Sequence, residues 1–124
     1  MSTGEMWDGI SEYSLLINLS EKGLVVLTGC SDPGIINIIE RAQKVLGIHK
    51  IYAVVGGFHI SSTSGGMKVA EFLCGLGVKM VSPCHCTHTR AKIGIIKILK
   101  EEYIRNGSGK SISIGCSEFP LEGL

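Results

Sequence analysis

Three short apolar runs, each followed by a segment with helical periodicity, constrain the fold of this chain most strongly. The runs are L-V-V-L-T-G at 24–29, I-Y-A-V-V at 51–55 and V-K-M-V-S at 78–82. Their β-branched residues and short length predict buried strands. Strands that alternate with helices of ten or more residues form a mostly parallel sheet with right-handed crossovers. In such a sheet, ligands bind beyond the carboxyl ends of the strands.

A hairpin, three helices and a last strand complete the predicted order. The β-rich segment 13–19 and the run 24–29 flank a polar turn with Gly23, which predicts an antiparallel hairpin. Apolar residues at helical spacing predict helices over 33–46, 67–76 and about 89–104, and alternation predicts a strand at 111–116. The order is β-β-α-β-α-β-α-β with a mostly parallel sheet, which places the chain in the α/β class as a single domain over residues 1–124.

Local residue chemistry predicts where these helices begin and end. Asp32 is expected to cap the first helix with its side chain, and Pro33 to occupy the first helical position. Gly47 is expected to end that helix. Thr87 or Thr89 is expected to cap the third helix.

Composition excludes several classes of function. The net charge of +1 gives no electrostatic reason to expect nucleic acid or an anionic membrane as a partner. No run reaches the roughly eighteen apolar residues that a membrane span requires, and we see no secretory signal. Five cysteines without disulfide spacing indicate reduced thiols in a cytoplasmic protein.

The densest cluster of metal-binding side chains is M-V-S-P-C-H-C-T-H, from Met80 to His88. His85 is either a metal ligand, since imidazole suits zinc, iron and manganese, or a polar loop residue that caps the next helix. Cys84, Cys86 and His88 could join it in a local site. However, the spacing C-H-C-x-H is too tight for a closed structural zinc site, so we interpret the cysteines as small packing residues.

Two further polar clusters follow the other strands. Asp32 could bind a metal or act as a base, although its position before Pro33 favours a helix cap, and the two roles can coexist. His59 follows two glycines and could contact substrate or metal, or form a hydrogen bond at the surface. Arg90 and Lys92 belong to the solvated face of the last helix, or help to hold an anionic substrate. Because each cluster follows a strand end, we expect one shared site.

Three ordered motifs resemble a known family over residues 13–114. They are G-L-V-V-L-T-G-C-S-x-P-G-I-I-N-I-I-E-R-A, A-V-V-G-G-F-H and P-C-H-C-T. Together they resemble the carboxyl-terminal half of metallo-β-lactamase-fold hydrolases, in the branch similar to dihydropterin-aminobenzene-phosphate synthase. The resemblance implies half of an αββα sandwich and a divalent metal, zinc or else iron or manganese, that activates water. It implies that His85 and Asp32 are metal ligands and that His59, Cys30 and Cys84 line the site.

The sequence departs from that family in two ways. Asp32 stands where the family has a histidine, and the chain contains no H-x-H-x-D-H motif, so the metal site is incomplete. We therefore expect half of a split or truncated hydrolase that is inactive alone. It would need a chain carrying the amino-terminal half-site, or self-association as a homodimer. The alternatives are a non-catalytic binding or assembly module and, third, a thiol-based activity through Cys84 or Cys86.

Overall fold

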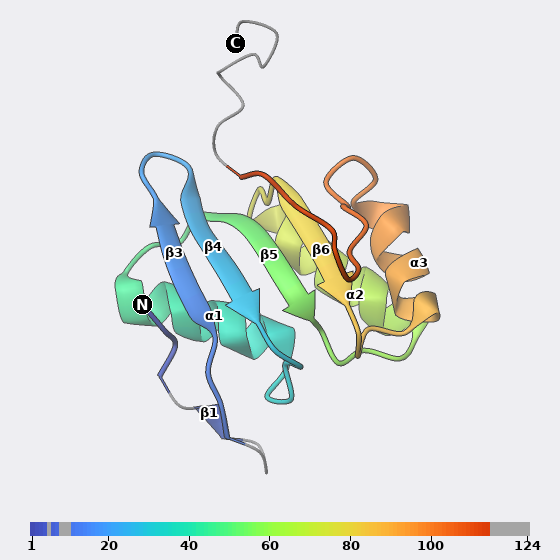
Figure 1. Ribbon diagram of the computed structural model, residues 1–124, viewed down its shortest axis with the longest axis horizontal. Helices are drawn as coiled ribbons and strands as arrows, with labels where there is room; N and C mark the ends of the chain where they lie inside the picture. Colours follow the sequence, from blue (N-terminus) through green and yellow to red (C-terminus); the bar gives the residue numbers. More distant parts are fainter. Residues whose placement is uncertain (5, 8–10, 115–124) are drawn as a thin grey trace, which may run out of the picture.

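A four-stranded mixed sheet forms the centre of the molecule (Figure 1). The computed structural model describes residues 1–4, 6–7 and 11–114. The strand order is β3-β4-β5-β6, in which β3 runs antiparallel to β4 and the other neighbours are parallel. The α/β class and the mostly parallel sheet are therefore confirmed. The elements are β1 (Met6–Trp7), β2 (Ser11–Glu12), β3 (Leu15–Leu19), β4 (Gly23–Thr28), α1 (Ile35–Leu46), β5 (Ile51–Gly57), α2 (Thr63–Gly75), β6 (Met80–Cys84) and α3 (Thr89–Ile98).

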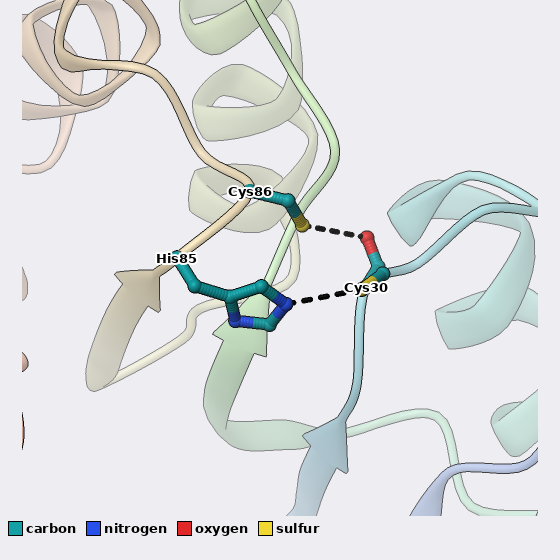
Figure 2. Close-up of side chains that lie close together, drawn as sticks. All are labelled: Cys30, His85 and Cys86. Atoms are coloured by element: carbon teal, nitrogen blue, oxygen red, sulfur yellow. Dashed lines mark hydrogen bonds between the residues drawn. The ribbon is translucent and has the colours of Figure 1, made fainter.

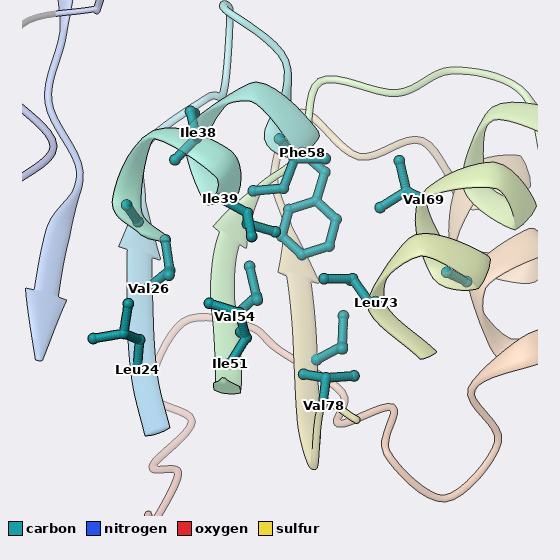
Figure 3. Packing of buried hydrophobic residues seen from close by; sticks show 14 of the residues in the cluster. Leu24, Val26, Ile38, Ile39, Ile51, Val54, Phe58, Val69, Leu73 and Val78 are labelled. Carbon is teal, nitrogen blue, oxygen red and sulfur yellow. The ribbon is translucent and has the colours of Figure 1, made fainter. Parts of the chain in front are cut away.

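The main core lies between one face of the sheet and the helices α1 and α2 (Figures 1 and 3). Because side chains alternate along a strand, paired residues of neighbouring strands point to the same face. Leu16, Val26, Val54 and Val81 are paired in this way, and all are at most 2% exposed. Burial of each such side chain stabilises the fold by about 1.5–3 kcal/mol.

The opposite face of the sheet is partly open at β3. Leu15 and Ile17 flank the buried Leu16, so they point away from the helices. They are 49% and 41% exposed, which is high for large apolar side chains in a sheet. The sheet therefore has one face covered by helices and a second face that is apolar and partly uncovered at β3.

The first helix starts later than predicted. Its N-cap is Gly34, with no side-chain cap bond, so the predicted cap by Asp32 and the helical position of Pro33 are wrong. These two residues instead lie in a turn that Gly34 closes by donating its N–H to the Ser31 carbonyl at 2.8 Å. Gly47 ends the helix in the left-handed conformation, as predicted.

The second helix starts earlier than predicted, at Thr63. The Ser62 hydroxyl caps it by accepting the Gly65 N–H at 3.0 Å. Gly65 and Gly66 are both helical, and Gly66 allows α2 and α3 to pack very closely. A Cβ on Gly66 would overlap the Ala91 carbonyl of α3, so a larger residue would push the helices apart.

The third helix is shorter than predicted. It ends at Ile98, whereas Tyr103 bridges to Val81 in parallel, beside β6. Val81 donates to the Glu102 carbonyl and accepts from the Ile104 N–H, both at 2.8 Å. These bonds replace helical ones, because an edge strand offers unpaired backbone groups. The predicted strand at 111–116 is absent over 111–114, and residues 115 and 116 lie outside the described part of the chain.

The predicted caps of α3 are also wrong. His88 is the N-cap and makes no side-chain cap bond. The Thr87 hydroxyl accepts the N–H of Phe58 at 2.9 Å, so it ties the loop after β6 to the end of β5. Within the described residues, no helix is long and apolar enough to cross a membrane.

Candidate functional site

The segments that follow β4, β5 and β6 meet at one edge of the sheet (Figure 2). Cys30 follows β4, and His85 and Cys86 follow β6, with the end of β5 between them. His85 Nε2 lies 3.0 Å from Cys30 Sγ, although 55 residues separate the two in sequence. Parallel strands place their carboxyl ends at the same edge, which is the physical reason for this proximity.

Cys30, His85 and Cys86 form a compact group of three potential metal ligands. Their ligand atoms all lie within 4.8 Å of one another. Cys86 also donates its thiol proton to the Cys30 carbonyl at 3.1 Å. The second ring nitrogen of His85, Nδ1, lies 3.4 Å from Cys84 Sγ. The imidazole is therefore contacted by one sulfur at each nitrogen.

The predicted interpretation of the cysteines as core residues does not fit their exposure. Cys30, Cys84 and Cys86 are half-buried, Cys74 is exposed, and all four are free thiols. Burial raises the pKa of the Cys86 thiol, and the neighbouring Cys30 raises it further, while a hydrogen bond from the His59 backbone opposes the shift. Three partly exposed thiols therefore lie at this edge of the sheet.

Asp32 and His59 form a second pair beside this group. His59 Nδ1 lies 3.4 Å from Asp32 Oδ1, and the two side chains are 59% and 20% exposed. Of the predicted site residues, the structure thus pairs Asp32 with His59, and His85 with Cys30 and Cys84. Asp32 lies outside the three-ligand group among the described residues.

Glu12 is a residue of this site that the sequence did not reveal. Its carboxylate accepts the backbone N–H of Ser31 at 2.8 Å and that of Asp32 at 2.9 Å. It also accepts the Thr28 hydroxyl at 3.2 Å. These bonds hold the loop that carries Cys30 and Asp32. No periodicity or spacing connects residue 12 with residues 28–32, so no sequence signal could have found it.

The loops of the site hold two residues in an uncommon backbone conformation. Ser31 has a φ of 63° and His59 a φ of 52°, in the left-handed region that residues other than glycine seldom adopt. Such conformations cost on the order of 1 kcal/mol or more and persist where surrounding contacts impose them. For Ser31 one such contact is visible, because its hydroxyl donates to the Gly57 carbonyl at 2.6 Å.

Gly57, at the end of β5, leaves the space in which the three-ligand group sits. A Cβ at this position would overlap Cys86 Sγ and would lie 2.7 Å from both His85 Cε1 and the Gly29 carbonyl oxygen. The site therefore depends on the absence of a side chain on the central strand.

Two hollows flank the group. One, of about 190 Å³, is lined by His59, Ile60, Ser61, Cys86 and His88. The other, of about 350 Å³, is lined by Cys84, His85, Lys92, Asn106, Gly107 and Ser108. Both are of a size that admits a small polar ligand beside the candidate metal ligands.

The fold and the site define a class of protein. No family model matches the chain. The structure matches that of Tm1679, a metal-dependent hydrolase of the β-lactamase superfamily, with a TM-score of 0.74 and 34% sequence identity. The match covers 84% of this chain and 41% of that chain. The chain therefore has the fold of one part of a metallo-β-lactamase-like hydrolase.

Sequence comparison gives a more particular relationship. Over 107 residues, or 85% of the chain, it is 36% identical to 7,8-dihydropterin-6-methyl-4-(beta-D-ribofuranosyl)-aminobenzene-5'-phosphate synthase of Methanocaldococcus jannaschii. A second protein of that organism, MJ0448, is 30% identical over 98 residues. The chain spans 36% of the length of each. It is a homologue of this synthase over part of the synthase's length, which confirms the resemblance stated above.

Proposed function

We propose that this chain forms one side of the active site of a metal-dependent hydrolase of the metallo-β-lactamase class. The observation that supports this most is the position of His85 close to the thiols of Cys30 and Cys86, at the carboxyl ends of parallel strands. The imidazole of His85 and the thiols beside it suit a divalent metal such as zinc or iron, and the carboxylate of Asp32 would also suit manganese. When bound, such an ion lowers the pKa of a coordinated water and makes it a nucleophile.

Individual residues of the chain would have different roles at this site. His85 is our first metal ligand, and Cys84, 3.4 Å from its Nδ1, orients the ring. Asp32 is the candidate for a second ligand, because carboxylate oxygens bind divalent metals. His59, whose ring faces Asp32 at 3.4 Å and is well exposed, can hold or move a proton at the adjacent hollow.

Lys92 gives a reason to propose an anionic substrate. It lines the larger hollow together with His85, and no carboxylate lines that hollow among the described residues. An ammonium group in such a position favours an anionic group such as a phosphate. Arg90, the other basic residue considered from the sequence, does not line the hollow.

A second half would complete the site. The chain lacks H-x-H-x-D-H, and it covers 41% of the matched hydrolase chain. We propose that an amino-terminal half with this motif packs on the partly open sheet face at Leu15 and Ile17, rather than a second copy of this chain. Apolar surface of this kind is typical of an interaction site.

The test is to co-express the chain with the part of the Methanocaldococcus jannaschii synthase that this chain does not cover. Metal content and hydrolysis of a chromogenic phosphoester would be measured for the complex and for each half. We expect a complex, bound metal and hydrolysis only when both halves are present. Substitution His85→Asn should abolish hydrolysis, whereas His49→Asn, at an exposed histidine outside the site, should not.

The proposed contact between the two halves at Leu15 and Ile17 can be tested separately. Ile17→Asp should prevent the halves from co-purifying, whereas Val45→Asp, at a similarly exposed position on α1, should not. A complex that forms normally but hydrolyses nothing would argue against the hydrolase and favour the non-catalytic assembly module. Hydrolysis by this chain alone, as a metal-free monomer, would contradict the shared site.

A further inference from the structure

The two sulfurs beside His85 point to a metal site that differs from the Asp32 and His85 pair. We propose that Cys30, His85 and Cys86 together bind one zinc ion on this chain alone, through two thiolates and one imidazole. This inference deepens the proposed function, since it uses the same edge of the sheet, but it does not depend on hydrolytic activity.

The distances within the group are close to those that zinc requires. With Zn–S of about 2.3 Å and Zn–N of about 2.0–2.1 Å, tetrahedral ligand atoms lie roughly 3.6–3.8 Å apart. Here Cys30 Sγ and His85 Nε2 are 3.0 Å apart, and all three ligand atoms lie within 4.8 Å. Side-chain shifts of about an ångström would therefore reach tetrahedral geometry, without movement of the strands.

The surroundings hold the three side chains in place. Cys30 follows β4 and Cys86 follows β6, the two strands that flank β5, and Gly57 of β5 leaves the space that Cys86 and His85 occupy. Cys84 at His85 Nδ1 can fix the ring with Nε2 toward the ion, as groups that contact the outer nitrogen of a ligand histidine commonly do. Asp32, by contrast, is turned toward His59.

Binding must release protons. Each thiol that becomes a thiolate ligand gives up one proton to solvent, so one zinc ion displaces two protons when both thiols are initially protonated. Cys86 then loses the hydrogen bond that it donates to the Cys30 carbonyl, and the metal bond replaces it. Three protein ligands leave a fourth position for water, and His85 lies on the exposed side of the group.

The sulfur and nitrogen ligand atoms also predict which metal ions the site prefers. Two sulfurs and one nitrogen favour zinc, and its spectroscopic substitute cobalt, over the hard ions magnesium and manganese, which prefer oxygen ligands. A site made of Asp32 and His85 would bind through oxygen and nitrogen. It would therefore prefer zinc and cobalt over magnesium and manganese less strongly. Selectivity between these ions therefore separates the two arrangements.

The experiment is a titration of the reduced chain with Co²⁺ under exclusion of oxygen, followed by displacement with Zn²⁺. All proteins carry Cys116→Ser, because Cys116 lies outside the described residues. We expect one ion per chain and a near-ultraviolet thiolate-to-cobalt band. The band should fall by about half in Cys30→Ser and in Cys86→Ser. His85→Asn should keep the band but weaken affinity by at least about 10-fold, since even loss of an outer-shell partner costs about 10- to 100-fold.

One further cysteine serves as a matched control. Cys74→Ser removes an exposed thiol on α2, outside the three-ligand group. It should retain the full band intensity. A band that is absent from the reduced parent chain, or that survives in the double variant Cys30→Ser/Cys86→Ser, would overturn the inference.

The same variants separate this inference from the proposed hydrolase. If the reduced chain shows no thiolate-to-cobalt band but the assembled halves hydrolyse phosphoester in a manner that requires His85, the thiolate site is refuted and the hydrolase stands. If cobalt binds through both thiolates but the assembled halves hydrolyse nothing, the thiolate site stands and the hydrolase fails.

Discussion

Replacement of Gly57 by alanine tests the geometry of the site most directly. The added Cβ would overlap Cys86 Sγ and would lie 2.7 Å from His85 Cε1 and from the Gly29 carbonyl oxygen. The two side chains can rotate away. The Gly29 carbonyl cannot move freely, because it accepts the Gly57 N–H at 2.7 Å at the junction of β4 and β5.

The expected loss in free energy of unfolding follows from the contact with this fixed carbonyl group. Overpacking of a rigid site typically costs about 1–3 kcal/mol, and the backbone contact places Gly57→Ala toward the upper end of that range. Gly75→Ala is the matched control, because a Cβ there meets nothing within 4 Å and lies in a helix. Alanine in a helix is more favourable than glycine by up to about 1 kcal/mol. The two variants should therefore differ by roughly 2–4 kcal/mol in free energy of unfolding.

Urea denaturation followed by far-ultraviolet circular dichroism measures this difference. For a domain of this size, 1 kcal/mol corresponds to roughly 4 °C in Tm, so thermal unfolding should separate the variants by about 10 °C. If Gly57→Ala unfolds at the same urea concentration as the parent chain, the close approach of Cys86, His85 and Gly29 around Gly57 is wrong. The distances assigned to the three-ligand group would then be wrong as well.

Three further changes test other parts of the structure. Glu12→Ala should lower the free energy of unfolding by about 1–3 kcal/mol in urea denaturation, because the N–H groups of Ser31 and Asp32 lose their acceptor; Glu12→Gln, which keeps an acceptor oxygen, should cost less. Leu73→Ala should cost about 2–5 kcal/mol by the same measurement, since the side chain is fully buried, and a loss below 1 kcal/mol would contradict its place in the core. Because the pKa of Cys86 is raised in the folded state, the metal-free reduced chain should lose stability as pH rises above about 8.5, where the unfolded thiol releases its proton first. Cys86→Ser should reduce this loss in denaturation curves measured at pH 8 and pH 10, and an unchanged slope would count against the shift.

Much of the fold could be predicted because local sequence patterns record burial. Val26, Val54 and Val81 belong to short apolar runs, and all three lie on central strands of the sheet. The left-handed end of α1 at Gly47 was predictable for a similar reason, since glycine adopts that conformation without steric cost. These features depend on residues adjacent in the chain.

The predictions that failed depended on distant residues. Asp32 has the local chemistry of a helix cap, but the carboxylate of Glu12 binds its backbone N–H, and the helix starts at Ile35 instead. The last helix was expected to continue to residue 104, but Val81 of β6 takes up the backbone groups of Glu102 and Ile104. In both cases, a hydrogen-bond partner from another part of the chain replaced a local one.

The candidate site also has features that the local sequence determines and features that depend on distant residues. The sequence by itself determined which segments carry metal-binding residues, because Cys30, His59 and His85 each follow a run with strand character. Only the tertiary structure decided that His85 meets Cys30 and Cys86 while Asp32 faces His59. The strand pattern reports on burial along the chain, whereas the partners of a side chain depend on loop conformations that contacts many residues apart impose.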